Sequence, residues 1–109
     1  MNVTLPVVTE PRLDLKAPDV AEAVMASALL ADHTRASILR MLRDGPHCVC
    51  ELAATLGERE NNVSNHLARL REAGLVRASR NEANARFIYY ERDEAAVAKA
   101  HAALAEVLR

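Results

Sequence analysis

The chain has 109 residues, half of them apolar, and carries 14 basic against 15 acidic side chains. This length supports one ordinary hydrophobic core, and the formal charge of -1 gives no overall attraction to polyanions. No apolar run approaches the roughly 20 residues that a membrane span needs, and no export signal is recognisable. We therefore expect a cytoplasmic protein with no membrane partner. Scarce aromatic residues and abundant Ala, Leu and Val favour a mainly helical domain.

The N-terminal part of the chain divides at Pro18. Residues 1–17 contain two prolines and follow no regular period, which predicts an extended N-terminal arm. Pro18 stands at a favourable first position of a helix. A single folded domain is therefore predicted for residues 18–109. It begins with a helix from Asp19 to Ala31, whose apolar residues need to be covered by another element.

Three further helices are predicted in the middle of the chain, and glycine marks where they end. Asp32 can cap the first of them, and the pair Gly45-Pro46 stops it. The next two end at Gly57 and Gly74, because glycine tolerates the left-handed conformation that commonly follows a helix. The predicted ranges of these two helices are Cys48–Leu56 and Glu60–Ala73.

The last third of the chain predicts a β-hairpin followed by one helix. Two stretches of β-favouring residues, Leu75–Ser79 and Arg86–Glu91, are joined by the turn-forming residues 80–84. From Asp93 to Leu108 a helical period returns. It places four side chains on one stripe, namely Val97, His101, Leu104 and Leu108.

The order of these elements is that of a winged helix-turn-helix, a mainly α fold with a small β-hairpin: four helices, two strands and a final helix. The first and last helices are additions to that unit, and each is short and apolar along one face. A two-fold dimer would cover both faces. We therefore expect a homodimer that packs through the first and last helices.

The fourth predicted helix has the side chains expected of a helix that reads DNA. Val63, Leu67 and Leu70 recur at a spacing that must face the core, which leaves small polar residues outward. Asparagine can bond adenine edges in the major groove, and serine and arginine reach bases or phosphates. His66 lies on the flank of this helix, where helix packing or a phosphate contact is favoured over metal binding. The candidate DNA-binding residues are Asn61, Asn62, Ser64, Asn65, His66, Arg69, Arg80 and Arg86.

Three segments of the chain carry recognisable motifs. Leu30–Arg35 reads LADHTR, Asn62–Val76 reads NVSNHLARLREAGLV, and Arg86–Tyr90 reads RFIYY. Together they resemble the ArsR/SmtB family of metal-responsive transcriptional repressors. The first resembles the family's Ala-Asp-Pro-x-Arg segment, with His33 in place of the frequent Pro, the second its recognition helix, and the third its second wing strand. The resemblance covers residues 20–109 and implies a homodimer that binds double-stranded operator DNA.

The two cysteines lie at the predicted start of the third helix. Within a regular helix, residues two apart point about 200° from each other, so two thiolates there cannot share an ion. If Cys48 is at or before the cap and Cys50 is in the first turn, the non-helical backbone can bring both sulfurs together. The positive end of the helix dipole would also lower both thiol pKa values.

The segment His47–Leu52 (HCVCEL) also resembles the Cys-Val-Cys-Asp-Leu box with which many family members bind thiophilic ions. Soft thiolates select ions such as Cd, Pb, As(III) or Zn over hard cations. The predicted function is therefore a transcriptional repressor that leaves its operator when such an ion binds Cys48 and Cys50.

Two thiolates do not complete a metal site, which normally has three or four ligands. The remaining ligands would come from His47, from a carboxylate, or from the N-terminal arm of the partner. A structural disulfide between Cys48 and Cys50 is not expected, because so short a loop is strained and constrains little of the unfolded chain.

A second metal site of the resembled family uses acidic residues and histidines on the last helix. Glu94 matches the first acidic ligand, but Ala96 and Val107 occupy the positions of the two histidines, so that zinc site is expected to be lost. Glu94 and His101 remain candidates for a degenerate site across the dimer axis, although a hydrogen-bonded interface histidine is favoured.

Three other functions remain open to the sequence. On the same fold, Cys48 and Cys50 can sense oxidants or reactive sulfur through thiolate chemistry. A metal-binding or storage protein that never touches DNA is the second, in keeping with the slightly acidic composition. An enzyme is the least favoured, because no Ser/His/Asp set, paired carboxylates or phosphate-binding glycine loop is visible.

Overall fold

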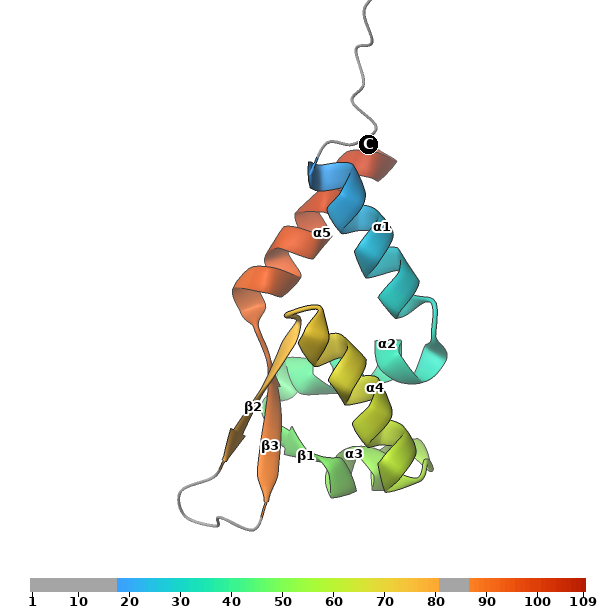
Figure 1. The fold of residues 1–109 in the computed structure, drawn as a ribbon, viewed down its shortest axis with the longest axis vertical. Coiled ribbons are helices and arrows are strands. Elements are labelled where there is room, and N and C mark those ends of the chain that lie inside the picture. Colours follow the sequence, from blue (N-terminus) through green and yellow to red (C-terminus); the bar gives the residue numbers. More distant parts are fainter. Residues whose placement is uncertain (1–17, 81–86) are drawn as a thin grey trace, which may run out of the picture.

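A computed structural model describes residues 18–80 and 87–109 of the chain. The predicted N-terminal arm, the turn between the hairpin strands and Arg86 lie outside the described residues. None of the helices in the described ranges combines the length and the apolar character needed to cross a membrane. In chain order, the elements are α1 (Pro18–Leu30), α2 (His33–Met41), the 3-10 turn η1 (Leu42–Asp44), β1 (His47–Cys48), α3 (Val49–Leu56), α4 (Glu60–Glu72), β2 (Val76–Arg80), β3 (Ile88–Arg92) and α5 (Glu94–Leu108) (Figure 1).

Short polar side chains and glycines set the helix ends, as the sequence predicts. Asp32 caps α2, with its Oδ1 accepting a hydrogen bond from the Arg35 N–H at 3.0 Å. Gly57 ends α3 in the left-handed conformation with φ 65°. The second helix ends earlier than predicted, because the chain tightens into η1 after Met41 instead of continuing to the glycine at position 45.

The hairpin predicted from β-favouring residues is confirmed, but it belongs to a sheet of three strands. The strand order is β1-β3-β2 and both pairings are antiparallel. In β1, His47 lies opposite Tyr90 and Cys48 lies opposite Tyr89. The sequence analysis did not predict β1. Because of this strand, the first cysteine is paired with β3 in the sheet that carries the wing.

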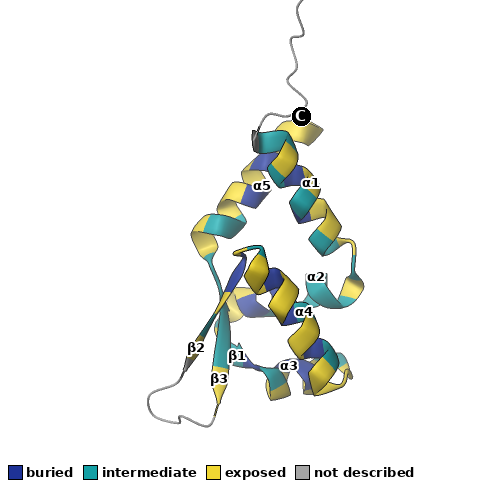
Figure 2. Cartoon of the chain, in the orientation of Figure 1, coloured by how far each residue is buried: buried dark blue, intermediate teal, exposed yellow. Residues whose placement is uncertain are grey.

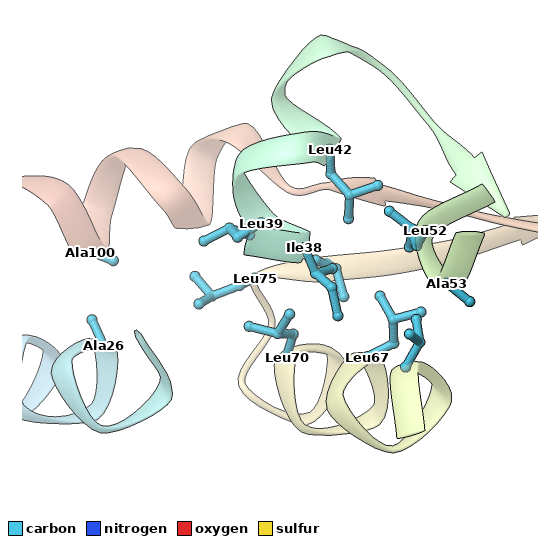
Figure 3. Packing of buried hydrophobic residues seen from close by; sticks show 12 residues of the cluster. Ala26, Ile38, Leu39, Leu42, Leu52, Ala53, Leu67, Leu70, Leu75 and Ala100 are labelled. Carbon is cyan, nitrogen blue, oxygen red and sulfur yellow. The ribbon is translucent and has the colours of Figure 1, made fainter. Parts of the chain in front are cut away.

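The core lies under α4 and is built from one face of each surrounding element. Val63, Leu67 and Leu70 of α4 are fully buried, together with Ile38 of α2 and Leu52 of α3. Figure 3 shows Leu67 and Leu70 pointing toward Ile38. Burying such a side chain contributes about 1.5–3 kcal/mol. The rotation of α4 about its own axis is therefore fixed by its inward face, as the sequence predicts.

Helices α1 and α5 pack against each other (Figure 1), and small buried side chains of both belong to the same hydrophobic core that lies under α4. The buried residues of this pair are alanines, among them Ala26 and Ala100, which face each other in Figure 3. Some of the larger apolar side chains of this pair lie on the outside, with Val24 64% exposed and Leu108 81% exposed. Figure 2 shows the same division between buried inner faces and exposed outer faces. Of the stripe predicted on the last helix, Val97 and Leu104 are half-buried, whereas His101 and Leu108 are exposed.

Candidate functional site

The outward face of α4 carries the residues that the sequence assigned to DNA. Its exposed side chains are Asn61, Ser64, Asn65, Ala68 and Arg69. Asn62 is half-buried, and its Nδ2 donates a hydrogen bond to Glu58 Oε2 at 2.9 Å. The exposed face is therefore small, polar and free of bulky apolar groups, which suits entry into a major groove.

The elements around α4 have the arrangement of a helix-turn-helix with a wing. Helix α3 packs against α4 across the left-handed turn at Gly57, and both contact α2. On the side of the sheet, α4 and β3 enclose an open groove of about 450 Å³ lined by Ser64, Ala68 and Tyr90, among others. Tyr90 of the wing thus lines one groove together with residues of the exposed helix face, a proximity that the sequence did not indicate.

The arginines of the wing differ in what the structure describes of them. Arg80 ends β2, but its side chain and all of Arg86 lie outside the described residues, so both stay predicted DNA contacts. Arg77 on β2 is paired, with its Nε 2.8 Å from Glu91 Oε1 and its Nη1 3.7 Å from Asp93 Oδ2. The hydrogen bond to Glu91 and the charge of that carboxylate raise the pKa of the Arg77 guanidinium.

His66 turns away from the exposed face of α4 toward the start of α2. Its Nδ1 lies 3.2 Å from Arg35 Nη1, and its Nε2 lies 3.8 Å from Asp32 Oδ1. The hydrogen bond from the Arg35 N–H lowers the pKa of the Asp32 carboxyl. Arg35 belongs to the LADHTR motif, but nothing in the sequence indicates that it meets His66, 31 residues further along.

The cysteines meet at the start of α3, and they do so as a disulfide. Cys48 is the N-cap residue with an extended backbone (φ -85°, ψ 164°), and Cys50 lies in the first turn. Their Cα atoms are 5.4 Å apart and the sulfurs are bonded. The expectation that these residues would not pair is corrected: the extended cap directs both sulfurs to one side, at a Cα separation typical of disulfides. Cys48 is 5% exposed, whereas Cys50 is exposed.

Two polar side chains hold this helix start in place. Glu51 Oε1 accepts a hydrogen bond from the Cys48 N–H at 3.1 Å, and Glu51 Oε2 lies 3.3 Å from His47 Nδ1. The bond from the Cys48 backbone, followed by the one to His47, lowers the pKa of the Glu51 carboxyl. His47 is therefore engaged with Glu51, and the structure does not bring it to the sulfurs. In the described ranges 18–80 and 87–109, no three His, Cys, Asp or Glu side chains converge as a metal site.

A groove of about 360 Å³ opens beside the cysteine pair. It is bounded by the start of α3, by two residues of α4 and by the first part of β3. One wall therefore carries the sulfurs, and another belongs to the helix proposed to read DNA. The residues that line it are Cys48, Val49, Cys50, Glu60, Ser64, Phe87, Ile88 and Tyr90.

The two candidates for a second metal site are not brought together within one chain. Glu94 pairs with Arg92, with Oε2 accepting a hydrogen bond from Arg92 Nη2 at 3.0 Å. His101 is exposed seven residues further along α5, about 10 Å along the helix axis. A site using both residues stays a prediction that needs the second subunit.

This geometry defines a winged helix-turn-helix protein, and comparisons with known proteins agree with that class. Residues 32–78 match the family described as "Bacterial regulatory protein, arsR family". The chain is 44% identical over 62 residues to the "Arsenic resistance transcriptional regulator ArsR1" of Pseudomonas putida, covering 56% of this chain and 46% of that protein. It is 45% identical over 49 residues to the "Arsenical resistance operon repressor" of Escherichia coli, covering 44% and 42% of the two chains.

Among solved structures, one described as a "Possible transcriptional regulator for arsenical resistance" superposes with a TM-score of 0.67 at 30% identity, covering 75% of this chain and 82% of that one. The chain belongs to the arsR family of bacterial regulatory proteins, a family of regulators and not of enzymes. The resemblance found in the sequence is thereby confirmed. The matched segments span less than half of the two curated relatives.

The contacts of Glu51 predict how the stability of the fold depends on pH. Because folding lowers the pKa of Glu51, its contribution to stability is complete above the pKa of the unfolded chain, about 4.3 for Glu, and is lost as pH falls through the folded value. Glu51→Gln should therefore lower the urea midpoint of unfolding at pH 7 and lose this effect at about pH 3. Glu72→Gln, an exposed change at the end of α4, is the matched control. If Glu51→Gln lowered the urea midpoint equally at both pH values, the stabilising role of the ionised Glu51 carboxylate would be contradicted.

Proposed function

We propose that this chain is a dimeric transcriptional repressor that binds operator DNA and is released when a soft metal or metalloid ion binds Cys48 and Cys50. The observation that carries the proposal is that the cysteine pair and the exposed face of α4 share one groove, through Cys48, Cys50 and Ser64. An event at the sulfurs therefore acts next to the surface that would contact DNA. Such a role requires a cytoplasmic protein.

DNA binding is supported by the exposed face of α4. In a helix-turn-helix, the second helix enters the major groove and its N-terminal residues contact base edges. Asn61, Ser64 and Asn65 occupy that part of α4 and are exposed. Arg69 lies one turn further along, where an exposed guanidinium can reach a phosphate. Base contacts from asparagine and a phosphate contact from arginine should differ in their dependence on DNA sequence and salt.

Two variants of α4 test this assignment. Asn65→Ala should weaken binding to the operator by about 1–3 kcal/mol and relax specificity at one base pair, because a base contact is removed. Arg69→Ala should weaken binding to all sequences and reduce the salt slope by about 1. Fluorescence anisotropy with operator and unrelated DNA between about 50 and 200 mM salt measures both. Equal losses on the two DNAs for Asn65→Ala would contradict base reading.

The proposed dimer rests on the outer faces of α1 and α5. The two helices bury alanines against each other and leave Val24, Val107 and Leu108 exposed. Exposed apolar side chains on the two added helices are the surface that a second copy would cover. A two-fold dimer would also present two copies of α4 to successive turns of the major groove, about 34 Å apart.

A charge on this surface should separate the subunits. Val24→Glu would bury an unpaired carboxylate in the proposed interface, so the dimer dissociation constant should rise at least about tenfold, a loss of about 1.4 kcal/mol. Ala54→Glu, on the exposed face of α3, is the matched control. Sedimentation velocity over a range of concentrations measures the equilibrium. If both variants associate like the original chain, the dimer uses another surface.

The cysteine pair fits a soft ion because two sulfurs lie side by side at a helix N-terminus, with one of them exposed. After reduction the pair offers two thiolates, and the ions proposed are Cd, Pb, As(III) and Zn. Further ligands would come from His47, after it releases Glu51, or from the N-terminal arm. The ion can release DNA only by binding more tightly to the form that does not bind DNA, and a coupling of 1–3 kcal/mol changes operator affinity about 5- to 150-fold.

Removing either sulfur should separate DNA binding from release. Cys48→Ser and Cys50→Ser should bind the operator like the original chain, whereas addition of the ion should no longer weaken their binding. Thr55→Ser, a conservative change on the exposed side of α3, is the control and should still respond. Anisotropy of the reduced proteins, titrated with each ion in turn, gives the result. Ion-dependent release of both cysteine variants would contradict the proposed site.

A redox signal is the second candidate, and the disulfide between Cys48 and Cys50 is the observation that favours it. Hydrogen peroxide would take two electrons and two protons from the two thiols, forming the disulfide and two water molecules. In buffer treated with a chelator, peroxide should then weaken operator binding, and a dithiol reductant should restore it. If only ions release the DNA, the redox candidate is wrong. If only peroxide does, the metal candidate is wrong.

A further inference from the structure

The side chain of Arg35 contacts both the end of α1 and the middle of α4. From the first turn of α2, its Nε donates to Leu29 O at 2.8 Å and its Nη2 donates to Ala28 O at 3.4 Å. Its Nη1 lies 3.2 Å from His66 Nδ1 on α4. The guanidinium therefore joins three helices through three different nitrogen atoms.

The contact with α1 supplies what that helix lacks at its C-terminus. The last carbonyls of a helix have no partner within it and carry the negative end of its dipole. Helix α1 has no basic residue in its own last turn, and Arg35 provides the positive charge and the donors. Charge-assisted hydrogen bonds of this kind are stronger than neutral ones. The end of α1 is thereby tied to the start of α2.

The contact with α4 determines the form of His66. Arginine can only donate, so Nδ1 of His66 must be the unprotonated, accepting nitrogen. The ring proton then lies on Nε2, on the side of Asp32 Oδ1 at 3.8 Å. The side chain of His66 is only 16% exposed, so water competes little for these positions. A histidine held in this way points toward the junction of α1, α2 and α4, and away from the surface of α4 that would enter the major groove of DNA.

We propose that Arg35 and His66 are positioning residues that set the angle between α4 and the α1–α5 pair, and thereby the spacing of operator half-sites that the dimer accepts. The proposal rests on the proposed dimeric DNA-binding function. It also replaces the predicted DNA contact of His66 with a contact inside the protein. Operator spacing would be determined at this junction because α1 and α5 hold the two subunits together while α4 reads each half-site.

A small change of angle is enough to matter. Helix α4 has 13 residues and is about 20 Å long. A rotation of about 10° moves a point 20 Å away by about 3.5 Å, close to the rise of one base pair, about 3.4 Å. Loss of the link between Arg35 and His66 should therefore change which spacer length binds best, in addition to any change in affinity.

The test compares two substitutions of His66, each of which places a polar side-chain atom at the position of a different ring nitrogen. In His66→Asn, the side-chain Oδ1 takes the place of Nδ1 and can accept from Arg35, whereas in His66→Gln the amide reaches the place of Nε2. Arg35→Gln removes the charged guanidinium group itself. Each protein is titrated onto the DNA upstream of its own gene and onto copies whose half-site spacer is one base pair longer or shorter. The ratio of affinities between spacers is the readout, because loss of folded protein alters all three affinities equally.

We expect His66→Asn to keep the original preference, and His66→Gln and Arg35→Gln to reduce it at least about fivefold, a change of about 1 kcal/mol. An unchanged ratio in both of the latter variants would overturn the proposal. A uniform loss with a smaller salt slope in His66→Gln and His66→Asn would also overturn it, since that result identifies a direct phosphate contact by His66. Failure of the original chain to bind any of the DNAs would instead remove the proposed function.

Discussion

The burial of one face of α4 is the constraint on which the rest of the structure depends. Val63, Leu67 and Leu70 are completely buried, and each contributes about 1.5–3 kcal/mol that would be lost if the helix turned about its axis. A shift of one residue rotates a helix by about 100° and would bring polar side chains such as Asn65 into the core. The core therefore fixes which side chains face outward, and the surface proposed to read DNA follows from the packing beneath it.

The extended backbone at Cys48 has three consequences at once. It lets Cys48 pair with Tyr89 in the sheet, it turns the two sulfurs to the same side, and it brings the Glu51 carboxylate back to the Cys48 N–H. A continuous helix through this segment would abolish all three. Tyr90 on the same strand and Ser64 of α4 line both grooves, so the cysteine pair, the wing and the outward face of α4 border the same space.

The parts of this structure that depend on local sequence could be predicted, whereas those that depend on distant contacts could not. The aspartate at position 32, the glycines and the spacing of buried leucines were sufficient to locate the helices, since caps and periodicity act within a few residues. Strand β1 has two residues and no alternation, and it exists only because β3 passes beside it. The partner of His66 likewise lies 31 residues away. The disulfide was missed because the strain of a short loop was given more weight than the non-helical cap, which was already expected to bring the two sulfurs together.

The backbone joins the α1–α5 pair to the DNA-reading unit at two places, between α1 and α2 and between β3 and α5, and the side-chain contacts at the two places differ. On one side is the junction of Arg35 and His66, made of side chains that can separate without breaking secondary structure. On the other, β3 runs directly into α5, and Asp93 both donates its N–H to Leu75 O at 2.9 Å and caps α5 through its side chain. At this second connection Asp93 therefore ties the start of α5 to Leu75, just after α4, directly where the chain passes from β3 into α5. A change of angle between the two parts would require the bonds of the Arg35 side chain to α1 and α4 to rearrange, while the helices themselves could stay intact.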